Sequence, residues 1–117
     1  DSHNILVIGD NDHDIYLAIE EIKKIKGGVV IVSKGEILEK LELPIAGLIS
    51  DKPIEEVKDI LEKMHKIAHD RLKVNKDIDP FMTLAFLALP VIPEIKITDK
   101  GLFDVVNFKF IDISVNE

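Results

Sequence analysis

A strongly apolar segment between two prolines limits the folds that this chain can adopt. Within Phe81–Leu89 only Thr83 is polar, so we expect this segment to be buried on nearly every side. Asp79 is suited to cap a helix that begins at Pro80. Pro90 ends the helix because proline has no N–H and restricts the residue before it. The segment has roughly half of the ~20 apolar residues that a membrane span requires, so it predicts a core or interface helix.

Length and composition are those of one soluble globular domain. The chain has 117 residues, of which 46% are hydrophobic and 32% are charged. Its net charge of −7 argues against a nucleic-acid partner, which would need clustered Lys and Arg. The absence of cysteine excludes disulfides and thiolate metal sites. With no secretory signal in the first residues, we expect a cytoplasmic protein with no membrane partner.

Hydrophobic patterning predicts an α/β fold on the borderline of α+β. The order β-α-β-β-α-α-β-β indicates a single domain over residues 1–117, with one mixed sheet and about three helices. The expected elements besides the apolar helix are strands at Asn4–Gly9, Val29–Ser33, Glu36–Leu43, Glu94–Ile97 and Val106–Phe110, and amphipathic helices at Ile15–Ile25 and Ile54–Ala68.

Local signals predict the ends of these elements. Asn11 or Asp12 is expected to cap the first helix, which Gly27-Gly28 closes. Lys34-Gly35 predicts a tight turn between two hairpin strands. Ser50 or Asp51 is expected to cap the second helix, with Pro53 in its first turn. The apolar connection Pro44–Ile49 is expected to pack against something.

An acidic loop after the first strand has a partial calcium-binding pattern. Asp10, Asp12 and Asp14 have the spacing of the first three EF-hand ligands, and Glu21 falls at the twelfth place. Ile15 stands where that loop requires glycine, and the helical pattern begins there. We therefore favour a solvated helix cap over a calcium site. The carboxylates also argue against a phosphate at this helix N-terminus.

Histidines supply the other candidate sites. His65 and His69 have the i, i+4 spacing of a metal-ligand pair, but the helical wheel turns them toward solvent, so we predict surface histidines. Ser2, His3 and Asn4 precede a predicted buried strand and could bind a polar heterocycle, whereas a frayed terminus is the simpler alternative. No pattern in the chain predicts catalytic residues or a metal site.

Three stretches resemble the C-terminal domain of the adenine deaminases of the amidohydrolase superfamily. They are Asp1–Ile5 (Asp-Ser-His-Asn-Ile), Pro44–Asp51 (Pro-Ile-Ala-Gly-Leu-Ile-Ser-Asp) and, above all, Pro80–Val105, which is long and irregular. The resemblance follows the chain in order from end to end. It implies an accessory domain of an enzyme of purine salvage, a hydrolase that converts adenine to hypoxanthine and ammonia.

The same resemblance implies that the catalytic residues lie elsewhere. In that family an N-terminal metal-dependent barrel, with Mn or Fe, activates water, and this chain lacks a His-x-His pair. The domain alone is therefore expected to be inactive and to bind no cofactor. The resemblance also raises the prospect that Ser2, His3 and Asn4 reach the substrate in the longer enzyme.

Two partners are expected, the barrel of the same longer chain and a second subunit of a homo-oligomer. The residues expected at this interface are Phe81, Met82, Phe86, Leu89 and Ile92, because the domain has little else to cover them. The missing initiator Met favours a piece of a longer protein. The alternative is a stand-alone interaction or ligand-sensing module that shares the ancestry of this domain.

Overall fold

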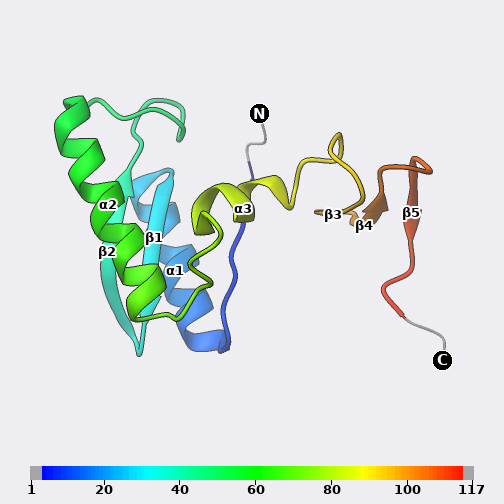
Figure 1. Cartoon of the computed structure of the whole chain (residues 1–117), viewed down its shortest axis with the longest axis horizontal. Helices are drawn as coiled ribbons and strands as arrows, with labels where there is room; N and C mark the ends of the chain where they lie inside the picture. The colour runs from blue at the N-terminus through cyan, green and yellow to red at the C-terminus, as the bar shows by residue number, and fades with distance from the viewer. Residues whose placement is uncertain (1–3, 115–117) are drawn as a thin grey trace. The chain divides into compact units, whose positions relative to one another are not determined.

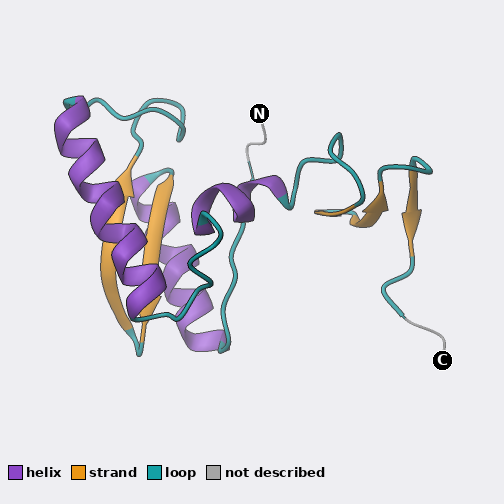
Figure 2. Cartoon of the chain, in the orientation of Figure 1, coloured by secondary structure: helices purple, strands orange, loops and turns teal. Residues whose placement is uncertain are grey.

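The computed structural model describes residues 4–114, and within them it contains three helices and five strands. Contacts divide the chain into two compact units, Val7–Phe81 and a second made of the residues before Val7 and after Phe81. The α/β class with three helices is confirmed (Figure 2). The strands, however, form two antiparallel sheets and not one mixed sheet.

The unit Val7–Phe81 contains a β-hairpin between two helices (Figure 1). Its elements are α1 (Asp12–Ile25), β1 (Gly28–Ser33), β2 (Glu36–Glu42) and α2 (Ile54–Asp70). Successive strand residues point to opposite faces, and neighbouring β2 residues contact different helices. Glu39 pairs with Lys63 of α2, whereas Lys40 pairs with Glu21 of α1. Each face of the hairpin is thus covered by one helix.

The core of this unit lies between the hairpin and α2. Ile31 of β1 and Leu41 of β2 are each 4% exposed, and Met64 of α2 is fully buried. The apolar stripe predicted for α2 supplies Met64 and Ala68 to the interior, as expected. Ile54 is the exception to the predicted stripe, because at the first turn of α2 it remains 78% exposed.

The N-terminal prediction of a buried strand at Asn4–Gly9 is wrong. These residues belong to no strand, and Ile8 is 77% exposed. An aliphatic run becomes a buried strand only where a sheet offers it an edge, and β1 of the hairpin pairs with β2 alone. The predicted mixed sheet is therefore not formed.

The predicted ends of the helices are partly correct. The Asn11 side chain accepts a hydrogen bond from Asp14 N at 2.9 Å and so caps α1, and Lys26 ends α1 in the left-handed conformation just before Gly27. The cap predicted for α2 is wrong, since Pro53 precedes its first residue without a side-chain hydrogen bond. The Ser50 hydroxyl accepts from Lys52 N instead, too early in the chain to cap the helix.

The apolar segment forms a shorter helix than predicted, α3 (Pro80–Phe86). The Asp79 carboxylate accepts a hydrogen bond from Phe81 N at 3.0 Å, as a cap should. After Phe86 the chain winds into tighter turns, with Leu89 N donating to Phe86 O at 3.2 Å, because Pro90 disfavours helical geometry before it. The helix is also less enclosed than expected, since none of its residues is buried.

The C-terminal unit contains a three-stranded antiparallel sheet of β3 (Ile95–Thr98), β4 (Gly101–Asp104) and β5 (Lys109–Ile111). Phe103 is its most enclosed aromatic residue, at 9% exposure, and contacts the edges of Phe108 and Phe110. The prediction of one final strand at Val106–Phe110 is wrong. The Asp104 carboxylate accepts hydrogen bonds from the backbone and side chain of Asn107, which turns the chain there.

Candidate functional site

The proposed substrate-binding segment is described only at its last residue. Ser2 and His3 lie outside the described residues, and Asn4 is exposed. The binding of a polar heterocycle by Ser2, His3 and Asn4 therefore stays a prediction.

The acidic loop before α1 binds the protein's own backbone. The two carboxylate oxygens of Asp14 accept hydrogen bonds from Gly35 N at 2.7 Å and Lys34 N at 2.9 Å. The side chain of Asn11 donates to the same carboxylate at 3.2 Å. The hydrogen bond from Asn11 is the main reason that the pKa of Asp14 lies below its ordinary value, and those from Gly35 and Lys34 lower it further. Asp14 thus fastens the hairpin turn to the start of α1, which supports a structural function over calcium binding.

The fourth residue of the calcium pattern has a different partner. Glu21 is 7% exposed. Its carboxylate accepts a hydrogen bond from Lys40 Nζ at 2.9 Å, with Lys24 at 3.8 Å. The hydrogen bond from Lys40 is the main reason that the pKa of Glu21 is lowered, and partial burial opposes it. Glu21 therefore joins α1 to β2.

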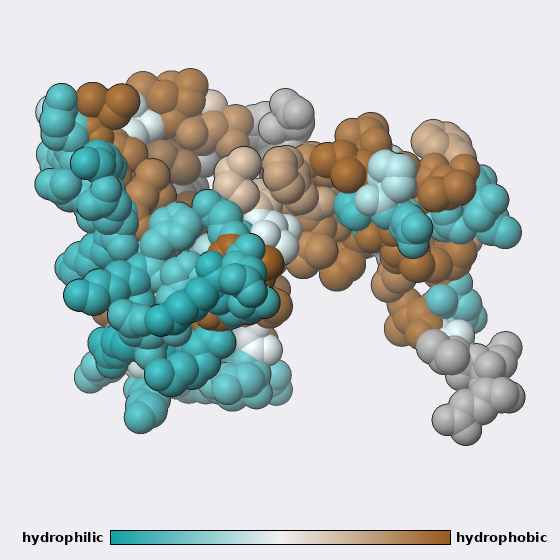
Figure 3. Space-filling model, in the orientation of Figure 1, coloured by the Kyte–Doolittle hydropathy of each residue, from teal (hydrophilic) through white to brown (hydrophobic). Residues whose placement is uncertain are grey.

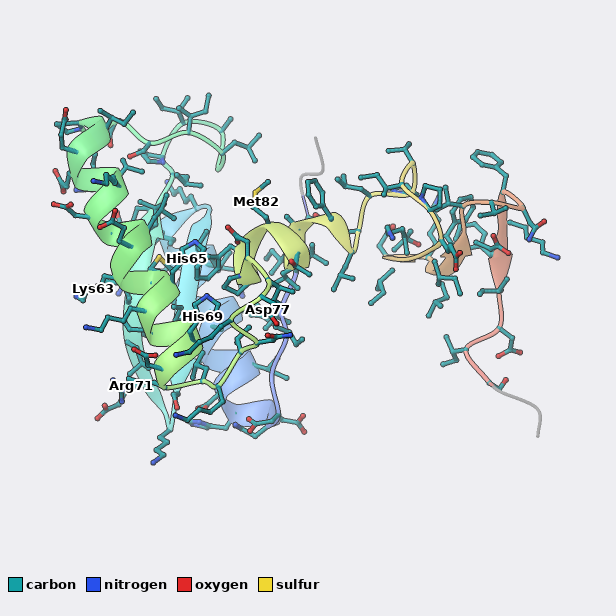
Figure 4. All side chains as sticks on the ribbon, in the orientation of Figure 1. Lys63, His65, His69, Arg71, Asp77 and Met82 are labelled. Atoms are coloured by element: carbon teal, nitrogen blue, oxygen red, sulfur yellow. The ribbon has the colours of Figure 1, made fainter. Side chains whose placement is uncertain are left out.

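His65 and His69 also contact their own unit, and they are less exposed than the predicted surface histidines. Both are half-buried on α2, on the side that faces the segment leading into α3 (Figure 4). The ring of His65 meets the Phe81 ring edge-on at 5.1 Å, and its Nε2 lies 3.5 Å from an Asp79 oxygen. Nδ1 of His69 lies 3.2 Å from the carbonyl of Val74. The two histidines hold the chain between α2 and α3.

The described part of the chain does not fit a divalent metal. Across residues 4–114, no group of three or more His, Asp or Glu side chains lies close enough to hold an ion. Nor does any helix in that range have the length and apolar character to cross a membrane.

The predicted interface residues differ in exposure. Met82 is 53% exposed, Phe86 43% and Ile92 40%, whereas Leu89 is half-buried. Phe81 is half-buried and packs against the core of its own unit, Val7–Phe81. An exposed apolar group therefore remains at Met82, Phe86 and Ile92.

A second exposed apolar group, which the sequence did not predict as a site, lies between β2 and α2. Ile45, Leu48 and Ile49 are 50%, 48% and 59% exposed. The sequence predicted that this connection packs against something; within its own unit its backbone contacts Gly27 through Gly47, whereas these three side chains stay about half exposed. The run of aliphatic residues in Pro44–Ile49 was the sequence signal for this group, but only the structure shows that their side chains are exposed.

Comparison with known proteins supplies the family. Residues 1–109 match the model of the adenine deaminase C-terminal domain. The chain is 62% identical over 111 residues to an adenine deaminase of Clostridium acetobutylicum, which is 95% of this chain and 20% of that protein. It is 50% identical over 115 residues to an adenine deaminase of Nitratidesulfovibrio vulgaris and 53% identical over 115 residues to adenine deaminase 2 of Carboxydothermus hydrogenoformans, in each case 98% of this chain and 20% of the relative. The chain thus spans about a fifth of the length of these relatives, and it belongs to the adenine deaminase C-terminal domain family.

Proposed function

We propose that this chain is the accessory C-terminal domain of an enzyme that hydrolyses adenine to hypoxanthine and ammonia in purine salvage. The observation that carries the proposal is the 62% identity, over 95% of the chain, to a protein named adenine deaminase. Identity at this level, continuous across both structural units, supports a common function of the whole protein.

The chemistry is assigned to the part of the longer protein outside this chain. The polar side chains of the described unit that resemble ligands, Asp14, Glu21, His65 and His69, make hydrogen bonds or ion pairs within it. We therefore expect the divalent metal, Mn or Fe, to be held by an N-terminal barrel, and we derive no step through it. The 117-residue domain alone is expected to be inactive.

The domain is proposed to support that barrel or a homo-oligomer through Met82, Phe86 and Ile92, with Leu89 and Phe81 beside them. The exposure of these apolar side chains, which lie close together in the sequence, supports the proposal, because contiguous exposed apolar surface marks an interaction site. Ser2, His3 and Asn4 are proposed to contact adenine in the assembled enzyme. In the longer protein, His3→Ala should lower kcat/KM, and an unchanged value would discard that assignment.

The test compares the longer protein with the 117-residue chain. Each is purified, supplied with Mn²⁺ or Fe²⁺ and incubated with adenine, and hypoxanthine and ammonia are measured. We expect equal amounts of both products from the longer protein and neither from the domain. A longer protein without activity would refute the proposed function, and an active domain would refute the assignment of the chemistry to the barrel.

The alternative of a stand-alone interaction or ligand-sensing module is tested by the gene. A reading frame that encodes a barrel with a His-x-His pair upstream of this chain supports the deaminase. A reading frame without one supports the module.

A further inference from the structure

The connection between β2 and α2 displays aliphatic side chains that its own unit leaves uncovered. Ile45, Leu48 and Ile49, here called the loop patch, are each about half exposed. Apolar surface gathers over this loop, at the upper left of the space-filling view (Figure 3). Solvated loops are usually rich in Gly, Pro, Asn, Asp and Ser, so three large aliphatic residues in one turn indicate a surface that is covered in the working protein.

The backbone under the loop patch is held in one shape. Ile45 and Ile49 exchange two backbone hydrogen bonds of 3.1 Å, and Leu48 N donates to Ile45 O at 3.1 Å. Between them Ala46 has φ 56°, a left-handed conformation that is unfavourable for a residue with a Cβ atom. A conformation that is locally unfavourable yet fixed by hydrogen bonds is typical of a binding surface.

The loop is also fastened to the start of β1. Leu43 N donates a hydrogen bond of 3.1 Å to Gly27 O. The backbones of Gly27 and Gly47 approach so closely that a Cβ atom on Gly27 would collide with Gly47 Cα. The loop patch is therefore presented by a rigid platform, which lowers the entropic cost of binding.

Acidic residues lie on both sides of the loop patch in the sequence. Lys52 forms an ion pair with Glu56, at 2.5 Å between Nζ and Oε1, and the charges of Asp51 and Glu42 also act on it. Lys52 thus lies among three carboxylates, of which Glu42 also pairs with Lys40 at 3.0 Å, in a chain whose net charge is −7. A symmetric contact with a second copy would bring two such acidic surroundings together, which is unfavourable.

We propose that the loop patch docks on an apolar surface flanked by Lys or Arg in the part of the longer deaminase that lies outside this chain. The inference rests on the proposed function. This chain corresponds to only 20% of the length of the matched relatives, so most of each relative lies outside it. The surface that covers the loop patch can therefore belong to the same polypeptide. The loop patch belongs to the unit Val7–Phe81, whereas Met82, Phe86 and Ile92 belong to the other unit, so the loop patch provides a point of attachment for the unit Val7–Phe81 itself.

Photo-crosslinking in the longer protein tests the docking partner. p-Benzoylphenylalanine is placed at position 48, and at the exposed Tyr16 of α1 as a matched control, since Tyr16 is 65% exposed. We expect position 48 to crosslink to a peptide of the same polypeptide outside these 117 residues, and position 16 not to do so. A crosslink to a second copy, to residues 82–117 of the same chain, or to nothing would overturn the proposal.

Thermal stability of the longer protein gives a second test. Leu48→Asp should lower its melting temperature, because a carboxylate would be buried in the docked surface, whereas Tyr16→Asp should not. The wild-type longer protein is first assayed for adenine deamination. If it deaminates adenine and Leu48→Asp melts at the wild-type temperature, the docking proposal fails alone. If it does not deaminate adenine, the proposed function fails, whatever the crosslinks show.

Discussion

Replacing Met64 with Ala tests the packing of α2 on the hairpin. Met64 is the only described side chain that is both large and fully buried, and it contacts Ile31 and Leu41. The change removes three heavy atoms from the core, which costs about 2.4 kcal/mol of transfer free energy at ~0.8 kcal/mol for each buried group. The cavity left behind adds to this, so we expect a loss of about 3 kcal/mol in the free energy of unfolding.

Urea unfolding of the 117-residue chain, followed by circular dichroism, measures this loss. Ile54→Ala is the matched control, because Ile54 lies on the same helix and is 78% exposed. We expect Ile54→Ala to change the free energy of unfolding by less than ~0.5 kcal/mol. If Met64→Ala costs as little as the control at an unchanged m-value, the described packing of α2 on the hairpin is wrong.

Three further changes test the contacts that position the loops. Asp14→Asn should lower the urea midpoint of unfolding at pH 7. The difference in midpoint from the wild type should shrink as the pH falls below about 3.8, because the pKa of Asp14 is lowered in the folded state, so its carboxylate stabilises the fold above that pH and loses this effect on protonation. An equal difference at pH 7 and pH 3 would contradict this. Gly27→Ala should destabilise more than Gly101→Ala, since both glycines have a positive φ (123° and 126°) but only Gly27 faces a collision, and equal urea midpoints would refute the close approach. Asp79→Ala should cost about 1 kcal/mol in urea unfolding by removing the cap of α3, and it should shift the NMR signals of His65 but not those of His13.

Local sequence signals predicted the parts of the fold that depend on neighbours in the chain. Asn11 caps α1, Lys34-Gly35 makes the hairpin turn, and Asp79 caps α3, each as its residue type predicts. These features need only a few adjacent residues to form their hydrogen bonds. The class of the fold and the number of helices followed from them.

The candidate site was less predictable because its residues are defined by distant partners. Nothing in the spacing of Glu21 indicates that Lys40 will bind it across 19 residues. The contact of His65 with Phe81 and Asp79 likewise joins two segments that the sequence presents as unrelated. Helical-wheel reasoning turned His65 toward solvent because it considers one helix at a time.

The sequence by itself determined the family of this protein, the apolar segment before Pro90, the turn at Lys34-Gly35 and the caps of α1 and α3. Each of these features depends on residues that are adjacent in the sequence. The tertiary structure alone decided which aliphatic residues are enclosed, with Met64 inside and Ile8 and Ile49 exposed. Hydrophobicity measures only the tendency of a side chain to leave water, whereas burial requires a second surface, and that surface comes from packing between distant parts of the chain.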